Sequence, residues 1–295
     1  MPATSANLGP AFDAAALAFS MYLRVKTRVS DEFSITAKGR DAQICGNLHN
    51  HLILDTYREV LESEEKAILP LALQINNKIP IGKGCGSSAA ARLAGIALAV
   101  HFGKLRWSDS QIVSEAARRE HHPDNAAACW LGGVAVAGTA NGWTVTASIS
   151  PKGRWPLLLA LPSEALSTEK ARRVLPDQYS RADAVTNIQS SALLITAFTQ
   201  GRPDLLRAAL HDRMHEPYRA ALCPLLPALQ QLKSFKMIGV ALSGAGPSVL
   251  IFLNPQSNVD TATREVARHL KIRGLSAELL PARITLRGAR ECWAV

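Results

Sequence analysis

The amino-acid sequence predicts an α+β protein of two domains. Its 295 residues are enough to bury two hydrophobic cores. Apolar side chains alternate with other residues from Phe19 to Val29, which is the period of a half-buried strand. The run Ser87 to Phe102 is rich in small and apolar residues, as in a tightly packed helix. The first set of predicted strands and helices ends near Pro151, and a second set starts after it. We therefore place the domain boundary between residues 152 and 153.

The first domain, 1–152, is expected to open with a loop at 2–13, because small, polar, glycine and proline residues dominate there. A strand at 33–36 is expected to pair with the strand at 19–29. Ser108 and Gln111 match the S-x-x-Q capping box, so a helix is predicted from that point. The other expected elements are helices at 50–61 and 87–102 and strands at 68–75, 132–137 and 144–149.

The second domain, 153–295, repeats the mixture of strands and helices. Ser167 is a suitable N-cap residue for a helix that runs to Val174. The remaining predicted helices lie at 184–199, 203–212, 218–232 and 258–271. The predicted strands lie at 157–161, 238–242, 249–253, 275–280 and 289–293.

Composition narrows the class of protein. The formal net charge is +9, but the lysines and arginines are scattered and no nucleic-acid-binding motif accompanies them, so we expect a basic surface or a small anionic substrate and no nucleic-acid partner. The five cysteines form no C-x-x-C pair, which argues against a disulfide framework or a zinc site and fits a reducing compartment. No signal peptide or membrane-spanning stretch is apparent, so we expect a cytoplasmic protein without a membrane partner.

A glycine-rich loop precedes the predicted helix at 87–102. Gly82, Gly84 and Gly86 alternate with other residues, and Ser87 and Ser88 follow. Backbone N–H groups in such a loop can converge, and a helix N-terminus favours an anion. The P-loop pattern fails here, and the dinucleotide fingerprint, although formally matched, lacks its strand and acidic context. The residues alone leave a phosphate site or a plain tight turn.

Two further polar segments of small residues, 2–13 and 243–248, complete a set of three with 80–91. With these three motifs the chain resembles the GHMP superfamily of small-molecule kinases. In detail it resembles the homoserine kinase family, on four segments. These are P-A-T-S-A-N-L-G-P-x-F-D at 2–13, E-x-H-P-D-N at 120–125, S-T-x-x-A-R-x-x-L-P at 167–176 and E-P-Y-R at 216–219.

The resemblance implies transfer of the γ-phosphate of ATP to the side-chain hydroxyl of L-homoserine, a step of threonine biosynthesis. It implies an N-terminal domain like the second domain of ribosomal protein S5 and a ferredoxin-like C-terminal domain, with the site between them. ATP and Mg²⁺ are the implied cofactors, and a homodimer stays open. Relatives usually carry a short strand before the first motif. This chain starts at the motif, so we expect that strand to be missing or the start to have been assigned late.

The resemblance also assigns the nucleotide and metal residues. The phosphate-binding loop comprises Pro80, Ile81, Gly82, Lys83, Gly84, Cys85, Gly86, Ser87, Ser88 and Ala89. Ser88 and Glu120 are the implied Mg²⁺ ligands, and one or two protein oxygens suffice because the phosphates supply others. Lys83 is either a phosphate contact or a solvated loop lysine.

Five residues match family positions that hold homoserine, namely Asn7, Asp13, His122, Arg172 and Arg219. Arginine suits a substrate carboxylate because it can bind both oxygens, and an aspartate suits an amino group. Motif spacing favours Arg172 over the adjacent Arg173, and Thr168 and Ser243 are weaker candidates. Asp13 is assigned to substrate binding first, and a role as catalytic base is kept as the alternative.

Other functions remain to be weighed. They are another GHMP kinase with a different alcohol acceptor, a ligand sensor without activity on the same fold, a nicotinamide oxidoreductase, and an RNA-binding protein. Departures from the family pattern occur at Ala11, Cys85 and His121, and the bulk of His121 bears most on the geometry of the site.

Overall fold

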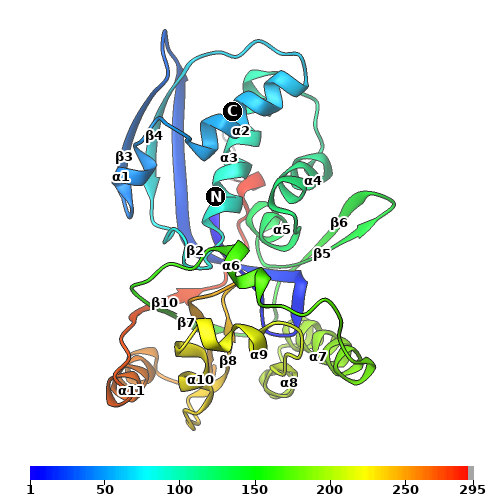
Figure 1. Cartoon of the computed structure of the whole chain (residues 1–295), viewed down its shortest axis with the longest axis vertical. Coiled ribbons are helices and arrows are strands. Elements are labelled where there is room, and N and C mark those ends of the chain that lie inside the picture. Colours follow the sequence, from blue (N-terminus) through cyan, green and yellow to red (C-terminus); the bar gives the residue numbers. More distant parts are fainter. Residues whose placement is uncertain (292–295) are drawn as a thin grey trace.

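A six-stranded sheet forms the first lobe of the molecule, whose computed structural model describes residues 1–291 (Figure 1). The sheet order is β3-β4-β2-β5-β6, and β1 pairs with β2. Among the strands within residues 1–291, only β3 and β4 run parallel to each other. The strands are β1 (Pro2–Asn7), β2 (Ala11–Val29), β3 (Ser34–Gly39), β4 (Leu71–Asn77), β5 (Val134–Ala140) and β6 (Trp143–Ile149).

Five helices belong to this lobe: α1 (Ala42–Cys45), α2 (Leu52–Ser63), α3 (Ser87–Phe102), α4 (Asp109–Glu120) and α5 (Asp124–Leu131). The predicted capping box is confirmed, because the Ser108 hydroxyl oxygen accepts from the Gln111 backbone N–H and the Gln111 side-chain oxygen accepts from the Ser108 backbone N–H. A Cβ atom on Gly95 of α3 would lie 2.5 Å from the carbonyl oxygen of Ile53 in α2. The small residues of α3 therefore serve the close helix packing that the sequence indicates.

The second lobe is a four-stranded antiparallel sheet of order β10-β7-β9-β8, with strands β7 (Pro156–Leu161), β8 (Met237–Leu242), β9 (Val249–Leu253) and β10 (Glu278–Arg283). Numbered along the chain, its strands lie in the order 4-1-3-2, which is the expected ferredoxin-like arrangement. The helical elements here are α6 (Thr168–Arg173), α7 (Arg181–Gln200), α8 (Pro203–Ala209), α9 (Glu216–Arg219), the 3₁₀ turn η1 (Ala220–Leu222), α10 (Leu225–Gln230) and α11 (Val259–Ile272). No helix within residues 1–291 has the length and apolar character needed to cross a bilayer.

The second sheet is buried on both faces. Leu157 and Leu159 of β7 belong to the large core that continues into the first lobe, whereas Leu158 and Ala160 belong to a separate core with residues of α10 and α11. The chain also returns to the first lobe after β10, where the Thr285 backbone donates to the Ala18 carbonyl. The two lobes thus share one apolar core, and the boundary at 152/153 stays a prediction.

The segment 2–13 corrects the sequence-based prediction of a loop. Residues 2–7 form strand β1, and every one of them is buried. Ala3, Thr4 and Ser5 are 0% exposed. Small polar side chains here permit tight packing against β2, α3 and α5, a requirement that composition alone does not distinguish from a loop.

Three other predictions are corrected. The strand near 33–36 exists, but it pairs with β4 and not with β2. The expected helix at 218–232 is divided into α9, η1 and α10, because Pro224 cannot donate a backbone hydrogen bond in a helix interior. Residues 289–291 form the 3₁₀ turn η2 (Ala289–Glu291) and not a strand, and the rest of that prediction, 292–293, lies outside the described residues.

Two helices were not predicted at all. Helix α5 follows Pro123 directly, has Asp124 in its first turn and is buried over its whole length. Its run of alanines lacks an amphipathic period, so periodicity could not find it. Helix α1 has only four residues, too short for any periodic signal.

Candidate active site

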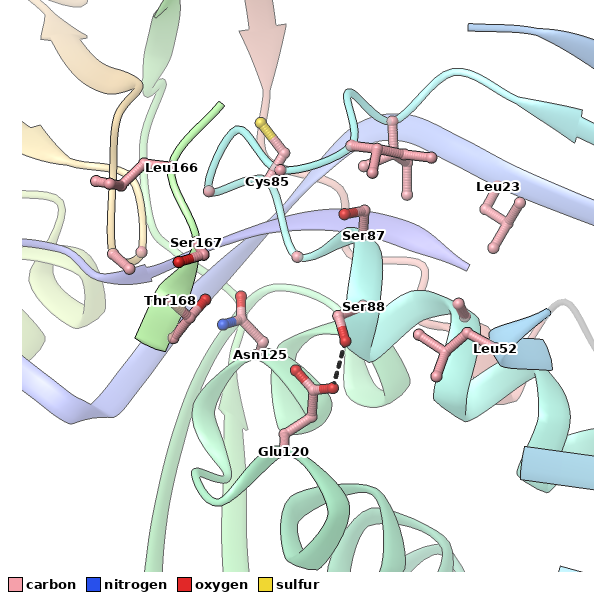
Figure 2. Close-up of a pocket in the computed structure, with 18 of the residues that line it drawn as sticks. Leu23, Leu52, Cys85, Ser87, Ser88, Glu120, Asn125, Leu166, Ser167 and Thr168 are labelled. Atoms are coloured by element: carbon pink, nitrogen blue, oxygen red, sulfur yellow. Dashed lines mark hydrogen bonds between the residues drawn. The ribbon is translucent and has the colours of Figure 1, made fainter. Parts of the chain in front are cut away.

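A cavity of about 630 Å³ is lined by residues of both lobes, and the three polar motifs meet in it. Figure 2 shows the start of α3 at this cavity, with α6 on one side and Leu23 and Leu52 on the other. The predicted site residues that line it are Asn7, Asp13, Ile81, Gly82, Gly84, Cys85, Gly86, Ser87, Ser88, Glu120, His122, Arg172 and Arg219. Pro80, Lys83 and Ala89 lie outside its lining. Thr168 also lines the cavity. Ser243 is not part of the lining, and its hydroxyl is bonded to the glycine loop.

Hydrogen bonds join the three motifs to one another. The Asn7 side chain donates to the carbonyl of Gly244 at 2.8 Å, and the Gly244 backbone donates to Ala6 at 3.1 Å. The Ser243 hydroxyl donates to the carbonyl of Gly84 at 2.7 Å. Each motif is thereby fixed by another, although 237 positions separate Asn7 from Gly244.

The glycine loop lines the cavity with a backbone of alternating conformation. Gly82, Gly84 and Gly86 have φ of +69°, +72° and +69°, and the residues between them have negative φ. Alternation of this kind favours the convergence of backbone N–H groups. The carbonyls of Gly82, Gly84 and Cys85 are bonded to the neighbouring segments around Leu166, Ser243 and Thr4. Helix α3, with 16 residues, begins at this loop and adds the positive end of its dipole. The arrangement favours a phosphate over a plain turn.

The side chains of this loop do not add charge to the cavity. The Lys83 ammonium donates to the carbonyl of Pro162 at 2.8 Å and to that of Ser163, and burial lowers its pKa. Burial also raises the pKa of Cys85 to about 12, so its thiol stays neutral beside the cavity. Lys83 therefore anchors the loop to the second lobe.

Ser88 and Glu120 come together, although one begins α3 and the other ends α4. The Ser88 hydroxyl donates to Glu120 Oε1 at 2.6 Å, a contact that is visible in Figure 2. Arg92 Nε donates to the same oxygen at 2.6 Å. A hydroxyl and a carboxylate oxygen are hard ligands of the kind that Mg²⁺ prefers. This pair fits the metal role expected of it, with Arg92 holding the carboxylate in place.

Asp13 and Arg172 face each other across the other part of the cavity. Arg172 forms hydrogen bonds of 2.7 and 3.0 Å to the two oxygens of Asp13. The Asn7 side-chain oxygen accepts from the Asp13 backbone at 3.0 Å, which supports the left-handed φ of +52° at Asp13. Arg173, the rejected alternative, turns away and pairs with Glu169 on the exposed side of α6.

His122 is held by a buried carboxylate. Its Nδ1 lies 2.9 Å from Asp124 Oδ1, which also accepts from the Asn125 backbone at 2.6 Å. The Asn125 side chain in turn accepts from Thr4 Oγ1. Burial opposes the charged imidazolium, but the hydrogen bond and charge of Asp124, aided by Asp13 and Glu120, outweigh it and raise the pKa of His122. Asp124 and Asn125 thus brace this segment against β1.

Arg219 lies at the back of the cavity and is 1% exposed. Its Nε donates to the carbonyl of Ala171 at 3.0 Å and its Nη1 to Nδ1 of His215 at 3.1 Å. Burial and the neighbouring charge of Arg172 lower the pKa of Arg219. Both direct partners are neutral, so the charge of this arginine is left for a ligand.

The apolar end of the cavity is formed by residues that no sequence motif marks. Its lining includes Leu23, Ile44, Leu52, Ile75 and Ile79, which come from β2, α1, α2, β4 and the segment before the glycine loop. These segments are separated in the sequence, so no short motif could have marked them. His51 also lines the cavity, and its Nε2 lies 3.1 Å from the Cys45 carbonyl oxygen.

Comparisons with known proteins agree with this architecture. The family model described as "GHMP kinases N terminal domain" matches residues 51–133, and "GHMP kinases C terminal" matches 194–272. The chain is 42% identical to a homoserine kinase of Solibacter usitatus over 98% of its own length and 94% of the relative's. It is 36% identical to a homoserine kinase of Desulfitobacterium hafniense over 98% and 97% of the two chains.

Solved structures show the same fold. A homoserine kinase from Cytophaga hutchinsonii superposes with a TM-score of 0.81 at 20% identity, covering 97% of this chain and 94% of that one. A mevalonate kinase from L. major gives a TM-score of 0.71 at 15% identity and covers 98% and 95%. The α+β fold expected for these kinases is therefore confirmed.

Proposed function

Since this chain belongs to the homoserine kinase family of the GHMP kinases, we propose that it transfers the γ-phosphate of ATP to the side-chain hydroxyl of L-homoserine. The product is O-phospho-L-homoserine, an intermediate of threonine biosynthesis. One observation supports this most directly. The phosphate loop and the Ser88–Glu120 pair share a cavity with Asp13 and Arg172, whose opposite charges match the amino and carboxylate groups of an amino acid.

ATP is assigned to the glycine loop and the apolar end of the cavity. The N–H groups of 82–88 and the N-terminus of α3 bind the phosphates. The adenine ring, which is flat and largely apolar, lies against Leu23, Leu52 and their neighbours. Ser88 and Glu120 are the side chains that hold Mg²⁺, which neutralises charge on the phosphates when it is bound.

Homoserine is assigned to the opposite end. In the substrate-free protein, Asp13 and Arg172 neutralise each other with side chains that are 31% and 35% exposed. A pair this exposed contributes about 1 kcal/mol or less, so it opens readily. The zwitterion then replaces the pair, with its amino group on Asp13 and its carboxylate on Arg172 and Arg219. Asn7 and His122 complete the pocket on the hydroxyl side.

Phosphoryl transfer needs mainly positioning and charge neutralisation. In the complex proposed above the ammonium group of homoserine occupies the carboxylate of Asp13 in place of Arg172, which favours substrate binding over proton abstraction by Asp13. The hydroxyl proton therefore leaves to phosphate or solvent. Location in the cytoplasm, a homodimer and the absence of a nucleic-acid partner remain predictions.

The test is ATP consumption by the purified full-length protein with homoserine, mevalonate or shikimate as acceptor. We expect turnover with homoserine and confirm the product by phosphorus NMR. Turnover with another alcohol alone would assign a different acceptor. Binding of homoserine and ATP without phosphate transfer would instead favour the silent sensor.

A further inference from the structure

Phe12, His215 and Arg219 form a cluster behind the substrate end of the cavity. Of these three residues, only Arg219 has a role in the reaction proposed above. We propose that His215 is the positioning residue of Arg219, so that the guanidinium is held ready for the substrate carboxylate, and that Phe12 completes the support. This inference rests on the proposed function. It concerns a residue that neither contacts substrate nor belongs to any of the motifs.

The hydrogen bonds of His215 define its tautomer. Nε2 lies 2.8 Å from the carbonyl oxygen of Gly9, which can only accept, so Nε2 carries the proton. Nδ1 therefore has a free lone pair, and Arg219 Nη1, which can only donate, lies 3.1 Å from it. The imidazole must be neutral to do both. It is 0% exposed, and burial, opposed by the nearby charge of Asp212, lowers its pKa to about 4.

Two fixed hydrogen bonds limit the rotation of Arg219. Nε is bound to Ala171 of α6 and Nη1 to His215, so the plane of the guanidinium is set by two separate elements. Nη2 remains as the donor for a ligand, and within residues 1–291 it has no hydrogen-bond partner. A guanidinium whose orientation is fixed in advance loses less entropy when it binds a carboxylate.

Phe12 provides a flat surface for this cluster. Its ring stacks on His215 with centroids 5.3 Å apart and an interplanar angle of 25°. The guanidinium carbons of Arg219 and Arg172 lie 5.4 and 5.5 Å from the same ring centroid. Cation–π attraction at this distance favours both guanidinium groups near the Phe12 ring, although their like charges repel. Both arginines assigned to the substrate carboxylate therefore contact one aromatic side chain.

His215 also joins Arg219 to the motif that carries Asn7 and Asp13. Gly9, which accepts its Nε2 proton, lies between Asn7 and Asp13 in the sequence. The side chain that orients Arg219 is therefore hydrogen-bonded to the segment that is proposed to bind the amino group of homoserine. Asp212 fixes the start of α9 by accepting from the backbones of His215 and Glu216 at 2.8 and 2.6 Å.

The chain supplies a matched control. In α11, His269 Nε2 lies 2.8 Å from the Ala228 carbonyl and Arg273 Nη1 lies 3.2 Å from His269 Nδ1, so the same unit occurs again at the same four-residue spacing. This second pair lies outside the lining of the cavity. A purely structural His–Arg unit should behave alike in both places, whereas a positioning unit should affect the substrate only at His215.

The experiment compares His215→Ala, His215→Asn and His215→Gln with His269→Ala in the full-length protein. For His215→Ala we expect the KM for homoserine to rise about 30-fold, with kcat and the KM for ATP within about threefold of wild type. Asparagine places an oxygen where Nδ1 accepts and should recover most of the KM. Glutamine reaches the Gly9 carbonyl but not Arg219 and should recover little. His269→Ala should leave all three constants unchanged.

Three outcomes would overturn the inference while leaving the proposed function intact. The first is an unchanged homoserine KM in His215→Ala. The second is a homoserine KM that His215→Gln restores and His215→Asn does not. The third is a fall in kcat accompanied by equal rises in the KM for homoserine and the KM for ATP. Thermal unfolding of each variant identifies a folding defect. If His215→Ala does not fold, the contrast between His215→Gln, with a raised homoserine KM, and His215→Asn, with a KM near wild type, carries the test. A wild-type protein without homoserine-dependent turnover overturns the proposed function and this inference together. If His215 acts through Arg219, the double variant with Arg219→Ala should be no worse than Arg219→Ala alone.

Discussion

Two hydrogen bonds of 2.7 and 3.0 Å join Arg172 to Asp13 across 159 positions of the chain. Asp13 belongs to the first strand pair and Arg172 to a short helix of the second lobe. The contact brings together the two charges that an amino acid presents. It also makes them mutually dependent, because the loss of one leaves the other without its partner.

Replacement of this arginine gives the first prediction. Arg172→Ala should raise the KM for homoserine by about 100-fold, because a bidentate contact with a carboxylate is lost, and should leave the KM for ATP nearly unchanged. Arg173→Ala is the control, since Arg173 is adjacent but exposed and paired with Glu169. Steady-state kinetics with each substrate varied in turn checks this. An equal rise of both KM values would show that Arg172 is structural.

The Ser88–Glu120 pair gives the second prediction. Glu120→Gln removes the charge but keeps an acceptor for Ser88 and Arg92, so the fold should persist while kcat falls about 100-fold. The Mg²⁺ concentration for half-maximal rate should rise as well. Glu115→Gln, on the same helix but bonded to Arg118 and Arg119, should change neither quantity. A lower kcat at an unchanged Mg²⁺ requirement would contradict the ligand role.

The glycine loop gives the third prediction. A Cβ atom on Gly84 would lie 2.1 Å from the backbone oxygen of Ser243, whereas one on Gly142 would meet nothing within 4 Å. Both glycines have similar φ, +72° and +78°. Gly142→Ala should therefore cost about 1 kcal/mol of left-handed strain alone. Gly84→Ala should lower the free energy of unfolding by more than this and should raise the KM for ATP at least tenfold. Denaturant unfolding measures the first effect and steady-state kinetics the second. Equal effects of the two would mean that the loop can relax.

Glu216 gives a prediction for pH. Burial, against the hydrogen bond from the Leu242 backbone, raises the pKa of this carboxyl from 4.5 to about 8. Between these values the folded state holds a proton that the unfolded state releases, so the free energy of unfolding should fall as pH rises from about 5 to 8. Glu216→Gln stays neutral, and its stability relative to wild type should grow over that interval, on the order of 3 kcal/mol.

Urea unfolding at several pH values measures this difference. Glu265→Gln is the control, because the Lys236 hydrogen bond lowers the pKa of Glu265 and that variant should gain nothing over the same interval. A Glu216→Gln curve that runs parallel to wild type from pH 5 to 8 would show that Glu216 is not neutral in the folded protein.

Most of the regular elements could be predicted because their signals are local. The alternation along β2, the capping box of α4 and the N-cap of α6 are each contained within a few residues. The predictions failed where a distant neighbour decides the conformation. Strand β1 resembles a loop in composition and is a strand only because β2 and two helices cover it. Helix α5 is hidden because no face of it meets solvent.

The sequence by itself determined the family, the three motifs and the residue types available for phosphate, metal and amino acid, because each is carried by short runs of residues. Only the tertiary structure decided how they are used. It ties Lys83 to backbone carbonyls, pairs Asp13 with Arg172 and collects the apolar end of the cavity from five separate segments. It also places His215 between Gly9 and Arg219. Contacts such as these depend on how distant segments pack, and no short segment of the chain records that packing.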